Sequence, residues 1–434
     1  MSYFGRLGYN YKGKYAASAT LRTDGSSRFA EETKFGTFWS VGGSWLMSDE
    51  AFITNKRTFS YLKLWATAGT SGNDQIGNYS YQQLYRFSNY ANAPVGYPYQ
   101  PGNDKLTWEK NLSYSFGLDF GLLNDRISGN INYYNRNTNG LIMENPISPT
   151  TGFTSRTENR GSMVNRGIEL QVQAEIIHTQ DFVWSVGANY TYNRNRVTDL
   201  GGKDTIPSIP AYLGYNVIGQ PTDVYRMQKY AGIDPTTGAA SWYAEDGSIT
   251  TDYAQAGTFI LDKKSADPKF FGGFNTSFTY KGISLGLDFS YVGGLWTYNN
   301  QWKDFNSASN YFQNLAVEAS DFWTPTNTGA KNPALDVGDN IYDSDRWLQK
   351  GDMLRLRNVM IAYNIPNSAV KRLKMENIRV YVQGQNLWYY APGYKGDPEV
   401  GVGSAESDLN RQGNISLFSY PQTKAITFGL SVTF

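Results

Sequence analysis

Residues Ala425 to Phe434 read A-I-T-F-G-L-S-V-T-F, and this stretch decides the fold class of the chain. Large apolar residues alternate there with small or polar ones. Successive side chains of a β-strand point to opposite faces, so the pattern predicts a strand with one apolar and one polar face. A stretch of this length could be a half-buried strand of a soluble domain. It also suits a transmembrane β-barrel, whose strands need roughly 9–11 residues to cross the hydrocarbon.

The composition favours an all-β protein. Aromatic residues make up 15% of the 434 residues, glycine occurs 44 times, and charged residues account for only 18%. Aromatic residues favour strands and glycine favours turns, whereas the helix-favouring charged residues are sparse. No apolar run approaches the roughly 18 residues that a membrane helix requires.

The same composition argues against most enzymes. The formal net charge is +1, so no strong field attracts nucleic acid. The chain has no cysteine and a single histidine, His178. Thiolate and histidine-cluster metal sites and most histidine-dependent catalysis are therefore excluded. We expect no cofactor and no enzymatic activity.

About thirteen long strands are predicted along the chain, joined alternately by short turns and long loops. The strands cover about 3–11, 15–22, 37–47, 59–70, 112–122, 127–133, 168–176, 182–192, 274–280, 283–291, 353–365, 377–387 and 425–434. The long loops cover about 71–106, 138–165, 197–269, 296–350 and 388–422. Short periplasmic turns and long extracellular loops are typical of transmembrane β-barrels, whereas a soluble sandwich has no reason to sort its loops. The alternation predicts an antiparallel transmembrane barrel.

The odd strand count predicts that the barrel is incomplete. The first and last strands of a closed antiparallel barrel run in opposite directions, and open sheet edges are not tolerated in lipid. The first residues, M-S-Y-F-G-R-L-G-Y-N-Y, also lack the basic and apolar regions of a secretory signal. We therefore expect residues 1–434 to form a single incomplete domain, the C-terminal part of a barrel, as a fragment or the product of a split gene.

Several motifs spread along the chain are specific in combination. They are D-G-S-S-R-F (24–29), L-T-W-E-K-N (106–111), G-L-D-F-G-L-L-N-D-R-I-S-G (117–129), N-R-G-I-E-L (165–170), L-R-L-R-N-V (354–359), V-Y-V-Q-G-Q-N-L-W (380–388), G-D-P-E (396–399) and Y-P-Q-T-K (420–424). Together they resemble the SusC/RagA family of TonB-dependent outer-membrane transporters.

The resemblance implies a barrel of about 22 strands in the outer membrane of a Bacteroidetes-like Gram-negative cell. An N-terminal plug domain fills such a barrel, TonB pulls on an N-terminal box, and a SusD-like surface lipoprotein covers the extracellular loops. The implied substrates are oligosaccharides or peptides. The sequence shows neither plug nor box, and about nine strands are missing relative to the family. An odd number of missing strands is what the directions of the first and last strands require for closure. Phe434 resembles the C-terminal aromatic signal for outer-membrane insertion.

Loop aromatic residues are the candidates for ligand binding, because aromatic faces stack on sugar rings and pack against protein partners. They are Trp296, Trp302, Tyr311, Phe312 and Trp323 in one loop, and Trp388, Tyr389, Tyr390 and Tyr394 in the last loop. The alternative is that these residues form interfacial girdles or pack the loops internally.

Three further groups of residues have weaker chemical patterns. Oxygen-rich spacing of Asp336, Asp339, Asp343 and Asp345 could hold Ca²⁺, although the EF-hand pattern is absent and solvated loop acids are the alternative. Glu109 and Glu169 lie on predicted strands, but no spacing places them together for glycoside hydrolysis. His178 follows a strand beside a short turn, where we expect a surface role.

These observations favour outer-membrane nutrient import by a SusC-like barrel. The alternative is a soluble or surface-exposed β-rich module for glycan binding or adhesion, and a glycoside hydrolase is a more distant one. An apolar band on one face of the long strands would distinguish the barrel from a sandwich with polar outer faces.

Overall fold

The computed structural model describes residues 1–208, 213–307, 314–335, 342–370, 375–401, 415–416 and 420–434. Thirteen long strands form one antiparallel sheet, and they follow one another across it in sequence order. They are β1 (Ser2–Tyr11), β2 (Tyr15–Gly25), β3 (Phe35–Leu46), β4 (Phe59–Asn73), β7 (Glu109–Leu122), β8 (Ile127–Asn139), β11 (Ser162–His178), β12 (Phe182–Asp199), β20 (Phe270–Tyr280), β21 (Ile283–Gly293), β24 (Met353–Asn364), β25 (Asn377–Tyr390) and β27 (Ala425–Thr433). All thirteen predicted strands are confirmed. Within the described residues, no helix is long and apolar enough to span a membrane.

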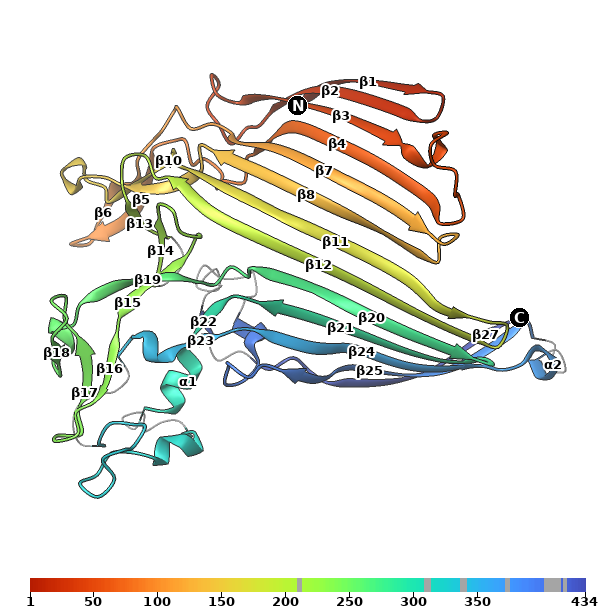
Figure 1. Cartoon of the computed structure of the whole chain (residues 1–434). Coiled ribbons are helices and arrows are strands. Elements are labelled where there is room, and N and C mark those ends of the chain that lie inside the picture. Colours follow the sequence, from red (N-terminus) through yellow and green to blue (C-terminus); the bar gives the residue numbers. More distant parts are fainter. Residues whose placement is uncertain (209–212, 308–313, 336–341, 371–374, 402–414, 417–419) are drawn as a thin grey trace. The chain divides into compact units, whose positions relative to one another are not determined.

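The chain divides into two compact units, which are described separately. Unit 1 comprises Met1–Thr205 and Gly272–Lys281, and unit 2 comprises Ile206–Phe271 and Gly282–Phe434. In unit 1, the long strands β1, β2, β3, β4, β7, β8, β11 and β12 run side by side, with short turns at one end and longer loops at the other (Figure 1). These loops contain two hairpins, β5 (Leu84–Tyr90) with β6 (Ala93–Gln100) and β9 (Ile142–Pro146) with β10 (Ser155–Asn159).

The long loops of unit 2 contain small sheets of their own. One sheet contains β13 (Thr205–Pro207), β14 (Gly214–Val217), β15 (Val224–Gln228) and β19 (Thr258–Ser265). The others contain β16 (Tyr230–Ile233), β17 (Ala240–Tyr243) and β18 (Ile249–Thr250), and β22 (Trp296–Asn299), β23 (Leu348–Lys350) and β26 (Ile415–Ser416). Helices are short: α1 (Asn300–Phe305), α2 (Asn367–Val370), and 3₁₀ turns at Met47–Asp49, Pro149–Thr151, Tyr253–Gln255, Val317–Ser320, Asp345–Trp347 and Pro398–Gly401.

The short turns of unit 1 reverse the chain with left-handed residues. Lys12 and Gly13 have φ of 53° and 69°, and Asn124 and Asp125 have φ of 59° and 61°. Glycine, asparagine and aspartate reach this region at least cost, so the chain turns within a few residues. The strands on either side therefore remain adjacent, which sets the register of the two hairpins.

The two faces of the unit 1 sheet differ in chemistry, as the strand register shows. On one face Leu118 lies between Leu64 and Ile131, and Ile131 lies opposite Leu170. On the other face, one residue along each strand, Asp119 lies between Lys63 and Asn130, and Asn130 lies opposite Gln171. The apolar face is uncovered, with Ile131 44% exposed. A broad exposed apolar face of this kind suits contact with lipid hydrocarbon.

Unit 2 repeats the arrangement up to the last strand. Ile361 lies opposite Val382, which in turn lies opposite Phe428 of β27. Ile426, Phe428 and Leu430 are 64%, 77% and 67% exposed on the same face. The strand predicted from Ala425 onward therefore presents its apolar side chains outward with those of its neighbours. The expected apolar band is present, whereas a sandwich with polar outer faces is not.

Two adjacent positions on β8 test this division. We expect Ile131→Arg to destabilise the assembled barrel in a bilayer by about 2–4 kcal/mol, because it places a charge in hydrocarbon. Asn130→Arg points to the opposite face beside Asp119, so its effect should stay below about 1 kcal/mol. The measurement is the free energy of unfolding by urea in lipid vesicles. Equal effects of the two substitutions would contradict the assignment of faces.

Candidate functional site

The polar face of the unit 1 sheet carries amide side chains that hydrogen-bond to one another and to neighbouring polar side chains. Asn132 donates to Glu169 at 2.9 Å, the Tyr134 hydroxyl donates to Asn193 at 2.9 Å, and Asn195 donates to Asn165 at 2.9 Å. Amide and carboxylate groups offer both donors and acceptors at closely spaced positions. This face can therefore hydrogen-bond a polar solute without covalent chemistry.

The two strand glutamates do not form a pair for glycoside hydrolysis. Glu169 lies opposite Asn132, which lies opposite Gly117 of β7. Glu109 starts β7 eight positions before Gly117, a separation of about 27 Å along the strand. Hydrolytic carboxylates lie within about 10 Å of each other. Glu109 instead accepts a bond from the backbone N–H of Ile142 at 3.3 Å.

Two of the sequence motifs pack together at the loop end of unit 1. Phe29 of D-G-S-S-R-F and Trp108 of L-T-W-E-K-N have ring centroids 5.6 Å apart, and Phe38 contacts Trp108 at 5.4 Å. These rings and Leu106 form a buried cluster. The Trp108 indole donates to the Lys34 carbonyl at 3.0 Å. These motifs build a core for the loops, so their role in this unit is structural.

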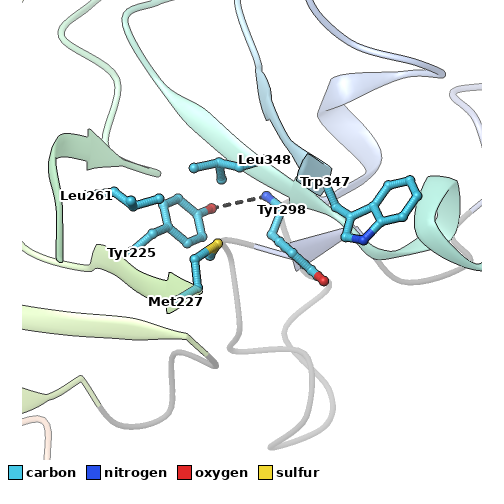
Figure 2. Packing of buried hydrophobic residues seen from close by; sticks show 6 residues of the cluster. All are labelled: Tyr225, Met227, Leu261, Tyr298, Trp347 and Leu348. Atoms are coloured by element: carbon cyan, nitrogen blue, oxygen red, sulfur yellow. Dashed lines mark hydrogen bonds between the residues drawn. The ribbon is translucent and has the colours of Figure 1, made fainter. Parts of the chain in front are cut away.

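A second core lies in the loops of unit 2 (Figure 2). It consists of the buried side chains of Tyr225, Met227, Leu261, Tyr298, Trp347 and Leu348. The Tyr225 hydroxyl donates to the Trp296 carbonyl at 3.0 Å and accepts from the Tyr298 N–H at 3.2 Å. Burial raises the pKa of the Tyr225 phenol well above its ordinary value, so the hydroxyl stays protonated and keeps both bonds.

Four of the predicted ligand-binding aromatics pack within this loop region. Trp296 lies in β22 and contacts the core, with Lys264 Nζ 4.6 Å from its ring centroid. Trp302 lies in α1 and also packs against the core, and Lys395 Nζ lies 5.3 Å from its ring centroid. Trp323 donates its backbone N–H to the Asn332 carbonyl at 2.9 Å, and Tyr394 is buried. All four residues thus contribute to packing within the loops.

Three other candidates lie on a strand, because β25 extends to Tyr390 and not only to Leu387 as predicted. Trp388 and Tyr390 lie opposite Leu356 and Leu354 on the apolar face and are 46% and 57% exposed. Tyr389 points to the other face, where its ring centroid lies 5.0 Å from the Arg355 guanidinium. The exposed rings of Trp388 and Tyr390 suit a membrane interface. Tyr311 and Phe312 lie outside the described residues.

The candidate calcium residues divide in a similar way. Asp336 and Asp339 lie outside the described residues. The Asp343 carboxylate accepts from the Tyr298 hydroxyl and from Lys303, both at 2.7 Å, and Asp345 accepts from the Tyr230 N–H at 2.9 Å. Both carboxylates thus bond to neighbouring protein groups. In the described part of the chain, no three His, Cys, Asp or Glu side chains are placed to hold a metal ion.

Tyr253 is held in the loops of unit 2. The Tyr253 hydroxyl donates to the Asp343 carbonyl at 2.8 Å, and burial, with the nearby Asp343 charge, raises the pKa of Tyr253 to about 12.

His178 is exposed at the short-turn end of β11, where its Nδ1 lies 2.8 Å from Glu175. The surface position predicted for His178 is confirmed.

A buried ion-pair network in unit 2 was missed by the sequence analysis. Arg355 of L-R-L-R-N-V pairs with Asp397 of G-D-P-E, and each side chain is only 1% exposed. Arg355 Nε lies 2.7 Å from Glu399, which also accepts from Arg357 at 2.9 Å. Asp397 further accepts from the backbone N–H groups of Glu399 and Gln422 at 3.1 and 3.2 Å. The network therefore fastens the last loop to β24.

Comparison with known proteins agrees with these features. Residues 1–387 match the family described as TonB dependent receptor-like, beta-barrel. The chain is 32% identical to the TonB-dependent receptor SusC of Bacteroides thetaiotaomicron, over 100% of this chain and 44% of that protein. It is 31% identical to the TonB-dependent receptor P26 of Formosa agariphila, over 100% of this chain and 46% of that protein.

A solved structure is similar over the whole chain. The RagAB peptide transporter has a TM-score of 0.88 and 31% sequence identity, and the match covers 100% of this chain and 47% of the transporter chain. The chain belongs to the TonB-dependent receptor β-barrel family, whose members are outer-membrane proteins, and its two-faced sheet is part of such a barrel wall. It spans just under half the length of the curated relatives that it matches.

The buried network predicts a local loss of stability when one carboxylate is removed. Asp397→Ala leaves Arg355 buried without its main partner, which should destabilise the attachment of the last loop by about 3–5 kcal/mol. The measurement is hydrogen exchange of residues 391–401.

Glu318→Ala is the matched control, because Glu318 pairs with Lys395 of the same loop at 3.1 Å on the surface. Its effect should stay within about 1 kcal/mol. Comparable effects of the two substitutions would contradict the assigned role of the buried network.

Proposed function

We propose that the chain forms the C-terminal part of the barrel of an outer-membrane nutrient importer of the SusC type. The observation that carries this proposal is the sheet with an uncovered apolar face and a hydrogen-bonding amide face. The apolar face contacts lipid, and the amide face lines the aqueous passage. The likeness to SusC and to the RagAB peptide transporter over the whole chain supports the same function.

The substrate in this proposal is an oligosaccharide or a peptide. Both carry many donors and acceptors, which the amides of Asn132, Asn165 and Asn193 can match. Import is translocation without bond breaking, and the wide separation of Glu109 from Glu169 agrees with a non-enzymatic role. TonB would supply the driving force through a plug and box belonging to the whole transporter.

The remaining features fit the same proposal. The long loops, at about 71–106, 138–165, 197–269, 296–350 and 388–422, would face the cell exterior and meet a SusD-like surface lipoprotein. The exposed Trp388 and Tyr390 would lie at the membrane interface. Phe434, 81% exposed at the end of the chain, would serve in insertion into the outer membrane.

A transport assay tests the proposal. An in-frame deletion of the gene for the whole transporter should abolish uptake of its substrate, and deletion of TonB should do the same because import requires that energy source. Fluorescently labelled oligosaccharides and peptides, offered separately, would identify the substrate class. Unchanged uptake of every labelled compound in both deletion strains, or recovery of the protein from the soluble fraction, would contradict the proposal.

A further inference from the structure

The β5–β6 hairpin of unit 1 forms a two-stranded sheet of its own, with nearly all of its residues exposed. Phe87 is 80% exposed, Tyr90 76% and Tyr85 59%. An isolated hairpin is marginally stable in water, and clustered exposed aromatic residues mark a surface that another molecule covers.

The turn fixes which backbone groups point out of the hairpin. Ala91 and Asn92 have φ of 49° and 64°, as in the two-residue turn that suits hairpin twist, and Tyr90 lies opposite Ala93. The pair that flanks such a turn is hydrogen-bonded, and bonded and non-bonded pairs then alternate along the strands. The backbone N–H and C=O groups of Tyr85, Phe87 and Asn89 therefore point away from β6.

The outer edge of β6 is blocked at two of its three corresponding positions. Pro98 and Pro94 lie opposite Tyr85 and Asn89, and Gly96 lies opposite Phe87. Proline has no N–H, so it occupies outward positions of edge strands and prevents further strand pairing there. The hairpin thus has one blocked edge, on β6, and one open edge, on β5.

Two side chains of β5 contact β6 across the hairpin. The Phe87 ring lies across Gly96, 3.0 Å from the position that a Cβ on this glycine would take. The Arg86 guanidinium lies 4.0 Å from the Tyr99 ring centroid. Among the described residues, the outward backbone groups of Tyr85, Phe87 and Asn89 have no hydrogen-bond partner outside the hairpin. Within the described part of the chain, this edge is therefore unpaired.

We infer that β5 accepts an extended strand of the surface lipoprotein by β-augmentation, an inference that rests on the function proposed above. Main-chain bonds to Tyr85, Phe87 and Asn89 would supply affinity, and the alternating aromatic side chains would supply specificity. A folded protein suits the surface better than a short peptide, because it can cover the edge and an aromatic face together. A second copy of this chain and a peptide substrate are the other possible occupants.

Proline substitution tests the edge, because it removes an outward N–H and leaves the bonds inside the hairpin. The probe is a SusD-like lipoprotein, produced without its lipid, and the whole transporter is held in detergent. Phe87→Pro should weaken binding about tenfold relative to Phe87→Ala, which loses the same ring but keeps the N–H. Pro94→Ala changes only the blocked edge on β6 and should bind as the unmodified protein does.

Hydrogen exchange provides a second readout that needs no variant. Lipoprotein binding should protect the amides of Tyr85, Phe87 and Asn89 and leave that of Gly96 unchanged. Equal binding of the Pro and Ala variants with no protection would overturn the inference and leave the proposed function intact. Absence of lipoprotein binding would overturn both the inference and the proposed partner. Protection by peptides, or by raised concentration of the transporter alone, would assign the edge to another occupant and also overturn the inference.

Discussion

Backbone hydrogen bonding is the constraint on which the rest of this structure depends. Lipid hydrocarbon offers no partner for an N–H or C=O group, so a strand that crosses it must pair with strands on both sides. Thirteen strands in one continuous antiparallel sheet meet this requirement between neighbours. Successive side chains of a paired strand point to opposite faces of the sheet. Leu118 therefore lies on the face toward the hydrocarbon and Asp119 on the other face.

The loops lie outside the hydrocarbon and are not subject to this constraint. They are stabilised by buried clusters of their own. Phe29 and Trp108 build a core from two distant motifs in unit 1, and Tyr225 and Tyr298 do so in unit 2. The last loop is attached by a buried ion pair between Asp397 and Arg355. The β5–β6 hairpin differs, because the described residues leave its aromatic side chains and the open edge of β5 uncovered.

The strands could be predicted from the sequence because one-sided contact with an apolar solvent imposes a period of two. Ala425–Thr433 forms β27 for this reason, and the other twelve strands follow the same rule. The end of β25 was predicted too early, since Trp388 and Tyr390 suit a strand at the membrane interface as well as a loop. Their pairing with Leu356 and Leu354 of β24 places them in the strand. This pairing is a contact between distant segments, which the local sequence does not show.

The candidate site was harder to predict because it depends on contacts between distant segments. Trp296 and Trp302 were selected for their aromatic faces, but irregular sequence carries no periodicity from which burial can be judged. Arg355 and Asp397 lie 42 positions apart, and no local pattern links them. The open edge of β5 could not be predicted from the sequence either. The turn at Ala91-Asn92 determines which backbone groups point out of the hairpin, and only then is it clear that Pro94 and Pro98 block the edge of β6 and not that of β5.

The central claim is that one face of the sheet meets lipid and the other meets water. Because these 434 residues contain no cysteine, single cysteines can be placed along β7 from Leu112 to Gly121, with any cysteine elsewhere in the assembled transporter replaced by serine. Spin labels at positions 112, 114, 116, 118 and 120 should be relaxed by lipid-soluble oxygen, and those at 113, 115 and 119 by a water-soluble nickel complex. Loss of this alternation, or access of the nickel complex to both sets, would contradict the account.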